Sequence, residues 1–124
     1  MQVSIHKILP LVVLVILSCT REPILDGFDS QKWQEDINGC NKERVELADE
    51  VLNRKAELVG LGQNEIIEVF GKPNRHELYS RNKKAFVYFV DGGPDCQEQK
   101  EIPDKLVVRF NGIGRVKEII LYKN

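Results

Sequence analysis

The chain has 124 residues, of which 42% are apolar and 30% are charged, and this is the composition of one soluble domain with a modest core. Eighteen basic and nineteen acidic residues give a formal net charge of −1, and no long run of one sign occurs. The sequence therefore lacks the basic surplus that would hold nucleic acid, and we expect no nucleic-acid partner.

The first eighteen residues have the layout of an export signal. Lys7 follows the amino terminus, residues 8–17 form an apolar run that only Pro10 interrupts, and Ser18 supplies a small residue before Cys19. This run is about half of the ~20 residues that a helix needs to cross a bilayer. We therefore expect residues 1–18 to be a signal peptide rather than a permanent membrane span.

The four residues Ile16-Leu17-Ser18-Cys19 resemble the lipobox of bacterial lipoproteins. The resemblance implies that Cys19 is acylated, that the signal is removed before it, and that the lipid bilayer is a partner of the mature chain. Because Thr20 rather than aspartate follows the cysteine, the resemblance also implies the outer membrane, with the domain in the periplasm. The alternative is an ordinary secretory signal with a chance cysteine.

The residues after Cys19 predict a short connection to a single domain. Residues 19–28 contain Pro23 and Gly27 and show no periodic pattern, which indicates a flexible tether. We expect one domain over residues 29–124.

Two cysteines, Cys40 and Cys96, are left in the mature chain and form an even pair in an oxidising compartment. We therefore predict a Cys40–Cys96 disulfide, which on the chain-entropy model stabilises the fold by about 4 kcal/mol. Zinc is the competing interpretation. It is disfavoured because neither cysteine has a second cysteine two to four residues away and His76 is the one mature histidine.

Two helices are predicted in the first half of the domain. Apolar residues recur at three- and four-residue spacings over 41–58, and charged residues fill the other side, with Glu50 and Arg54 placed for an ion pair. A second, short helix over 63–70 ends at Gly71-Lys72-Pro73. A capped turn before them begins at Ser30, and Trp33 is expected to cover the edge of the core or, alternatively, to contact a partner.

The period then changes from 3.6 to 2. Strands are predicted at 76–80, 85–90, 105–110 and 115–122, with turns at 81–84 and 111–114. Helices followed by hairpin-linked strands indicate an α+β fold, in which two helices pack on one face of a three- to four-stranded antiparallel sheet.

The segments 58–73 (LVGLGQNEIIEVFGKP), 86–89 (FVYF), 106–110 (LVVRF) and 114–116 (GRV) together resemble the SmpA/OmlA (BamE-like) lipoproteins. The resemblance implies a two-layer domain of two helices and three strands, which a secreted β-lactamase inhibitor protein also has. This chain departs from the outer-membrane assembly subunit of that family in its cysteine pair and its longer 91–104 connection. No functional residue is therefore transferred from that subunit.

Enzymatic activity is not expected. The mature chain offers one histidine, no Gly-x-Ser-x-Gly motif and no glycine-rich phosphate loop, so neither a catalytic residue nor a cofactor is predicted. The acidic residues of the 91–104 connection lack the ordered alternation of a calcium loop, so no metal is predicted; they are Asp91, Asp95, Glu98, Glu101 and Asp104.

The 91–104 connection is the candidate binding loop, because long connections without secondary structure often serve binding. Its candidate residues are Asp91, Gly92, Gly93, Pro94 and Asp95. The alternative is a tolerated insertion that the disulfide holds for stability. The functional expectation is a membrane-anchored, non-catalytic interaction module with an envelope protein partner. The alternative is an inhibitor or small-ligand binder that acts on an envelope enzyme or cell-wall fragment.

Overall fold

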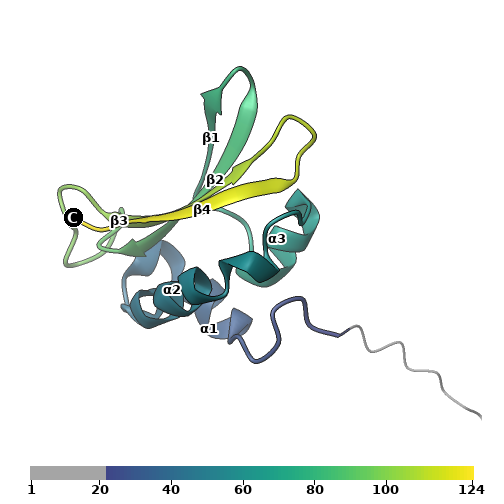
Figure 1. Ribbon diagram of the computed structural model, residues 1–124. Coiled ribbons are helices and arrows are strands. Elements are labelled where there is room, and N and C mark those ends of the chain that lie inside the picture. The colour runs from purple at the N-terminus through teal and green to yellow at the C-terminus, as the bar shows by residue number, and fades with distance from the viewer. Residues whose placement is uncertain (1–21) are drawn as a thin grey trace, which may run out of the picture.

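A computed structural model describes residues 22–124 as two layers, with the helices on one face of a sheet (Figure 1). The predicted signal peptide and Cys19 lie outside the described residues. The elements in chain order are α1 (Ser30–Glu35), the 3₁₀ turn η2 (Ile37–Gly39), α2 (Glu43–Asn53), the 3₁₀ turn η3 (Lys55–Glu57), α3 (Gln63–Phe70), β1 (Arg75–Ser80), β2 (Lys83–Asp91), β3 (Asp104–Phe110) and β4 (Val116–Tyr122).

The sheet is an antiparallel meander with the strand order β1-β2-β3-β4. One register row runs across all four strands as Arg75, Val87, Val107 and Ile120. The predicted α+β class and antiparallel sheet are confirmed. The helical layer has three α-helices in the described residues rather than the two predicted, because the expected turn at residue 30 extends to the six-residue helix α1.

The domain begins earlier than the sequence predicts. Leu25, which was expected in a flexible tether, and Phe28, which was expected at the end of the tether as an apolar anchor of the next turn, keep only 2% and 8% of their surface exposed and belong to the main core. The cap of α1 also differs, because the carboxylate of Asp29, rather than Ser30, accepts the backbone N–H of Lys32 at 3.0 Å. The expected tether is therefore part of the packed domain from Leu25 onward.

The predicted helix over 41–58 is shorter and interrupted. Arg54 leaves helical geometry (φ −117°, ψ 17°), and the chain continues in η3 before Leu58 enters the core. The Arg54 guanidinium bonds to carboxylate oxygens of both Glu50, at 3.3 Å, and Glu57, at 2.8 Å. The predicted Glu50–Arg54 pair is thus present, and its arginine marks the end of α2.

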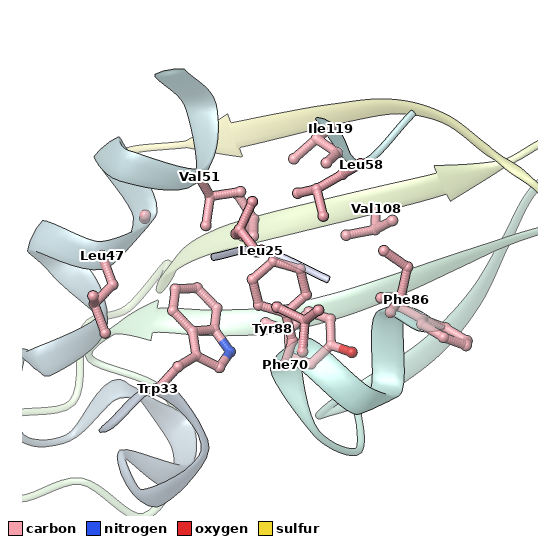
Figure 2. Close-up of a cluster of buried hydrophobic side chains, with 14 of the residues drawn as sticks. Leu25, Trp33, Leu47, Val51, Leu58, Phe70, Phe86, Tyr88, Val108 and Ile119 are labelled. Atoms are coloured by element: carbon pink, nitrogen blue, oxygen red, sulfur yellow. The ribbon is translucent and has the colours of Figure 1, made fainter. Parts of the chain in front are cut away.

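Aromatic side chains fill the centre of the core between the layers (Figure 2). The ring of Trp33 lies 5.3 Å from that of Phe70 and 6.1 Å from that of Tyr88, in edge-to-face arrangements. The Tyr88 hydroxyl donates to the carbonyl oxygen of Gly71 at 2.8 Å, where α3 ends as predicted. Trp33 is fully buried, so it is a central core residue and cannot contact a partner.

A buried arginine and aspartate connect the helical layer to the sheet. The Asp36 carboxylate, 1% exposed, accepts the backbone N–H groups of Asn41 at 2.8 Å and Arg44 at 3.1 Å. The Arg44 side chain reaches across to β2, where Nη1 donates to the carbonyl oxygen of Phe89 at 2.8 Å. Its Nε donates to the carbonyl oxygen of Trp33 at 2.8 Å. These bonds satisfy backbone groups that would otherwise be buried without partners.

Candidate functional site

The disulfide joins the helical layer to the long connection after β2. Cys40 and Cys96 are bonded with an S–S distance of 2.00 Å and a Cα–Cα distance of 5.1 Å, which is the predicted pair. Next to it, the backbone of Gly39 packs directly on β2: a Cβ atom at Gly39 would lie 2.4 Å from the carbonyl carbon of Val90. The disulfide therefore lies at a close approach between η2 and the sheet.

The predicted binding loop is folded back onto the domain rather than offered to solvent. Gly92 and Gly93 are buried, and the backbone N–H of Gly93 donates to the carbonyl oxygen of Asn38 at 3.0 Å. The Asn38 side chain in turn donates to the carbonyl oxygen of Pro94 at 2.9 Å. Among the five candidate residues only Asp95 is exposed. The first half of the connection is thus a structural element, and a partner could reach Asp95 and the exposed residues 97–99 and 101–102 of the second half.

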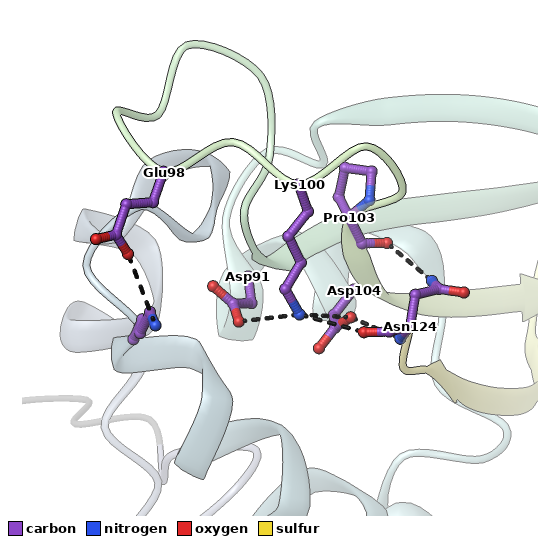
Figure 3. A network of polar contacts seen from close by, with 7 residues as sticks. Asp91, Glu98, Lys100, Pro103, Asp104 and Asn124 are labelled. Carbon is purple, nitrogen blue, oxygen red and sulfur yellow. Dashed lines mark hydrogen bonds and ion pairs between the residues drawn. The ribbon is translucent and has the colours of Figure 1, made fainter.

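Lys100 lies between two of the acidic residues of this connection (Figure 3). Its ammonium nitrogen is 3.3 Å from a carboxylate oxygen of Asp91 and 3.2 Å from one of Asp104. The hydrogen bond to Asp104 is the main cause that raises the pKa of Lys100. Asn124 joins the group through its backbone N–H, which donates to Asp104 at 2.8 Å. The ammonium thus takes the place that a cation would need, and within residues 22–124 no three metal-ligating side chains gather.

The face of the sheet that points away from the helices, which we call the open face, is the largest functional candidate. The register places on it the outward residues of all four strands: Arg75, Glu77 and Tyr79; Ala85, Val87 and Phe89; Lys105, Val107 and Arg109; Glu118, Ile120 and Tyr122. Figure 1 shows no helix on this side of the sheet. An antiparallel sheet commonly places polar residues on such a face.

The centre of the open face is apolar although no second layer covers it. Ala85, Val87 and Val107 are 1–5% exposed and form a cluster separate from the main core, with Tyr79 packed against it. The sequence analysis missed this face, but a signal existed. Every position from Ala85 to Val90 is apolar, and an unbroken run indicates a strand that is buried on both sides.

Cationic side chains lie across aromatic rings on the open face and shield its apolar centre. The Arg75 guanidinium is 5.2 Å from the ring centroid of Phe89, and the Lys105 ammonium is 5.7 Å from that of Tyr122. Such contacts stabilise by ~0.5–1 kcal/mol where they are exposed. Tyrosine and arginine are also the residues enriched at the energetic centres of protein interfaces.

Arg109 organises the middle of the open face. Its guanidinium lies 5.1 Å from the ring centroid of Tyr79 and donates to Glu118 at 3.0 Å and to the hydroxyl of Tyr122 at 3.3 Å. The hydrogen bond to Glu118 is the main cause that raises the pKa of Arg109, which is therefore charged at neutral pH. Its Nε is buried without a hydrogen-bond partner in the described part of the chain.

Charge is divided between the two layers. The helical part, residues 22–71, contains five basic and twelve acidic residues, a formal net charge of −7, whereas the sheet part, residues 72–124, contains eleven basic and seven acidic residues, a net charge of +4. The near-neutral total therefore conceals an acidic layer and a basic one.

His76, the one histidine among residues 22–124, lies on the exposed strand β1 with its ring 5.0 Å from that of Phe86, in an edge-to-face contact. The contact is a packing interaction at the edge of the sheet. No helix within residues 22–124 is long and apolar enough to cross a membrane.

No family model, curated protein or solved structure matches the chain.

Proposed function

We propose that the chain is a lipid-anchored, non-catalytic interaction module of the bacterial envelope, which binds a protein partner through the open face of its sheet. The observation that carries this proposal is the apolar centre of the open face, which is buried beneath aromatic and cationic side chains but has no covering layer. A surface of this composition gains free energy when a partner removes its remaining rings and apolar atoms from water.

The charges of the open face select the partner. Arg75 and Lys105 form no ion pair with any described residue, whereas Arg109 is paired with Glu118. A partner with carboxylates facing Arg75 and Lys105 would pair one exposed and one half-buried cation and be drawn toward the basic layer. The proposed partner is therefore an envelope protein with an acidic, partly aromatic surface.

The position of Leu25 supports a particular orientation at the membrane. Leu25 is buried in the core on the helical side of the sheet and lies six residues after Cys19. Six extended residues span at most ~20 Å, so an acylated Cys19 would hold the helical layer close to the bilayer. The open face would then point away from the lipid and toward the periplasm.

The interaction is tested by site-specific photo-cross-linking in intact cells. A photoreactive phenylalanine is placed on the open face at Glu77 or Tyr122, and, as the matched control, at Lys55 on the exposed side of η3. We expect one defined adduct from the two open-face positions and none from Lys55. Adducts from Lys55 alone, or none from either open-face position, would contradict the proposal. A hydrolase as the partner, with its activity reduced in the complex, would instead favour the inhibitor alternative.

The anchor is tested separately, by labelling cells with radioactive palmitate and separating the membranes. We expect the wild-type chain to be labelled and to sediment with membranes, and Cys19→Ala to lose both properties. The control is the Cys40→Ala/Cys96→Ala double variant, which removes the same chemical group elsewhere and should stay labelled. Equal labelling of Cys19→Ala and the wild type would refute lipidation at Cys19.

A further inference from the structure

A hollow of about 430 Å³ lies where α1, α3 and the turn after α3 meet. Its lining includes Ile37, Phe70 and Pro73 on the apolar side, and Gln34, Arg44 and Lys72 on the polar side. Ile37 is 65% exposed although it is a large aliphatic residue. The volume lies within the ~300–1,000 Å³ of ordinary ligand sites.

Arg44 is the unusual member of this lining, because it is a buried cation whose guanidinium forms no direct ion pair with a described residue, although the charge of Asp36 acts on it from nearby. Only 3% of its surface is exposed, and no carboxylate forms an ion pair with its guanidinium in the described residues. The nearby Asp36 carboxylate is engaged by two backbone N–H groups instead. Buried charges in proteins are ordinarily paired, since removing a charge from water is costly.

The hydrogen bonds of Arg44 leave one nitrogen available. Nε donates to Trp33, and Nη1 donates to Phe89 and to the side-chain oxygen of Asn74. Nη2 keeps contact with solvent and donates to no described residue. Burial is the main cause that lowers the pKa of Arg44 to about 10, so the group is still a cation at neutral pH.

Gln34 adds a hydrogen-bond acceptor at the rim. Its Nε2 donates to the carbonyl oxygens of Glu68, at 3.3 Å, and Val69, at 3.2 Å, which fixes the amide against the end of α3. No described residue donates to its Oε1. The hollow thus combines a guanidinium N–H, a second cation at Lys72, one free acceptor and the exposed apolar side chain of Ile37.

We propose that this hollow binds the C-terminal end of a peptide, with the terminal carboxylate on Nη2 of Arg44 and an apolar last side chain against the exposed side chain of Ile37. A C-terminal residue carries its carboxylate and its side chain on one Cα atom, which matches a cation beside an apolar side chain. The backbone N–H of that residue would donate to Oε1 of Gln34. The carboxylate would also give the Arg44 guanidinium a directly bonded anion, which Asp36 does not supply.

This site does not rest on the proposed function. The hollow is lined by the helical layer and the turn after α3, whereas the proposed protein partner contacts the open face. Loss of open-face cross-links would leave the carboxylate site untouched, and absence of peptide binding would leave the interaction module untouched.

The test is calorimetric titration of the full chain in detergent micelles with the peptide acetyl-Gly-Ala-Leu, with a free terminal carboxylate or with a terminal amide. We expect the free acid to bind and the amide to bind at least about tenfold more weakly, because a hydrogen bond to a charged group is lost. A third peptide, with an internal glutamate and an amidated end, separates a terminal carboxylate from a side-chain carboxylate.

Two variants locate the binding without altering Arg44, whose replacement could unfold the domain. Ile37→Glu adds a carboxylate at the rim and should weaken the free acid at least about tenfold. Ile113→Glu makes the same change at an 82% exposed residue that does not line the hollow, and should leave the affinity unchanged. Thermal unfolding of both variants checks that they are folded.

The proposal is overturned if the acid and amide bind equally, if the acid does not bind, or if the two variants have the same affinity. Equal binding of the internal-glutamate peptide would overturn the assignment to a C-terminus.

Discussion

Replacement of Gly39 by alanine should destabilise the domain far more than the same change at Gly60. Both glycines have positive φ, 69° and 93°, so an alanine at either position pays for a left-handed backbone, at about 1–2 kcal/mol. At Gly60 nothing lies within 4 Å of the added Cβ atom. At Gly39 that atom would meet the backbone of β2, at 2.4 Å from the carbonyl carbon and 2.5 Å from the carbonyl oxygen of Val90.

The difference between the two variants isolates the contact between η2 and β2. Backbone atoms inside a sheet cannot rotate away, so we add an overpacking cost of about 1–3 kcal/mol at Gly39. The expected totals are therefore about 1–2 kcal/mol for Gly60→Ala and about 2–5 kcal/mol for Gly39→Ala.

Urea unfolding, followed by fluorescence of the single and fully buried Trp33, measures both variants. With a urea dependence of ~1–3 kcal/mol per molar, a difference of about 2 kcal/mol separates the midpoints by roughly 1 M. Equal midpoints for Gly39→Ala and Gly60→Ala would refute the reasoning, since the crowding at Gly39 would then contribute nothing.

Two further predictions concern the long connection after β2. The Cys40→Ser/Cys96→Ser variant should lose about 4 kcal/mol of stability, because the disulfide closes a loop with a sequence separation of 56 residues in the unfolded chain. The reduced wild type should have the same melting temperature as the variant. A variant that melts at the same temperature as the oxidised wild type would contradict the prediction. Lys100→Met should speed amide hydrogen exchange at Asn124 and in the connection, because it removes the ammonium between Asp91 and Asp104. The control Lys83→Met, on the β1–β2 hairpin, should leave exchange at these positions unchanged. Unchanged exchange at Asn124 in Lys100→Met would show that Lys100 does not hold Asn124 in place.

The elements that the sequence predicts well are those with their own local signals. The helix α3 carries an apolar face and ends at a glycine followed by a proline, and β2 and β3 are rich in β-branched and aromatic residues. Tertiary structure decides the elements that were missed. Lys55 to Glu57 are good helix formers, yet Leu58 must reach the core and Gly60 must bond to Val116, so the chain leaves α2 at Arg54.

The candidate sites were harder to predict because their partners come from distant parts of the chain. Arg44 is surrounded in the sequence by other charged residues of a helix, which predicts that it faces solvent. In the structure it is buried, and its guanidinium donates to carbonyl oxygens that lie 11 and 45 residues away in the chain. Leu25 is an isolated apolar residue in a segment without periodicity, so its burial has no local signal, whereas Phe28 next to the capped turn was expected as an apolar anchor. The disulfide, in contrast, could be predicted from the number of cysteines left after Cys19 and from the expected oxidising compartment.

Because each strand of the sheet pairs with its neighbour in the chain, two hairpins and one longer connection suffice to build it. Short-range pairings of this kind form quickly, whereas thiol oxidation takes seconds to hours. Cys96 lies in the one long connection between strands, and Cys40 follows the turn that packs on β2. The reduced chain can therefore reach its native topology first. Folding then brings the two thiols together, and the disulfide forms between cysteines that are already in contact.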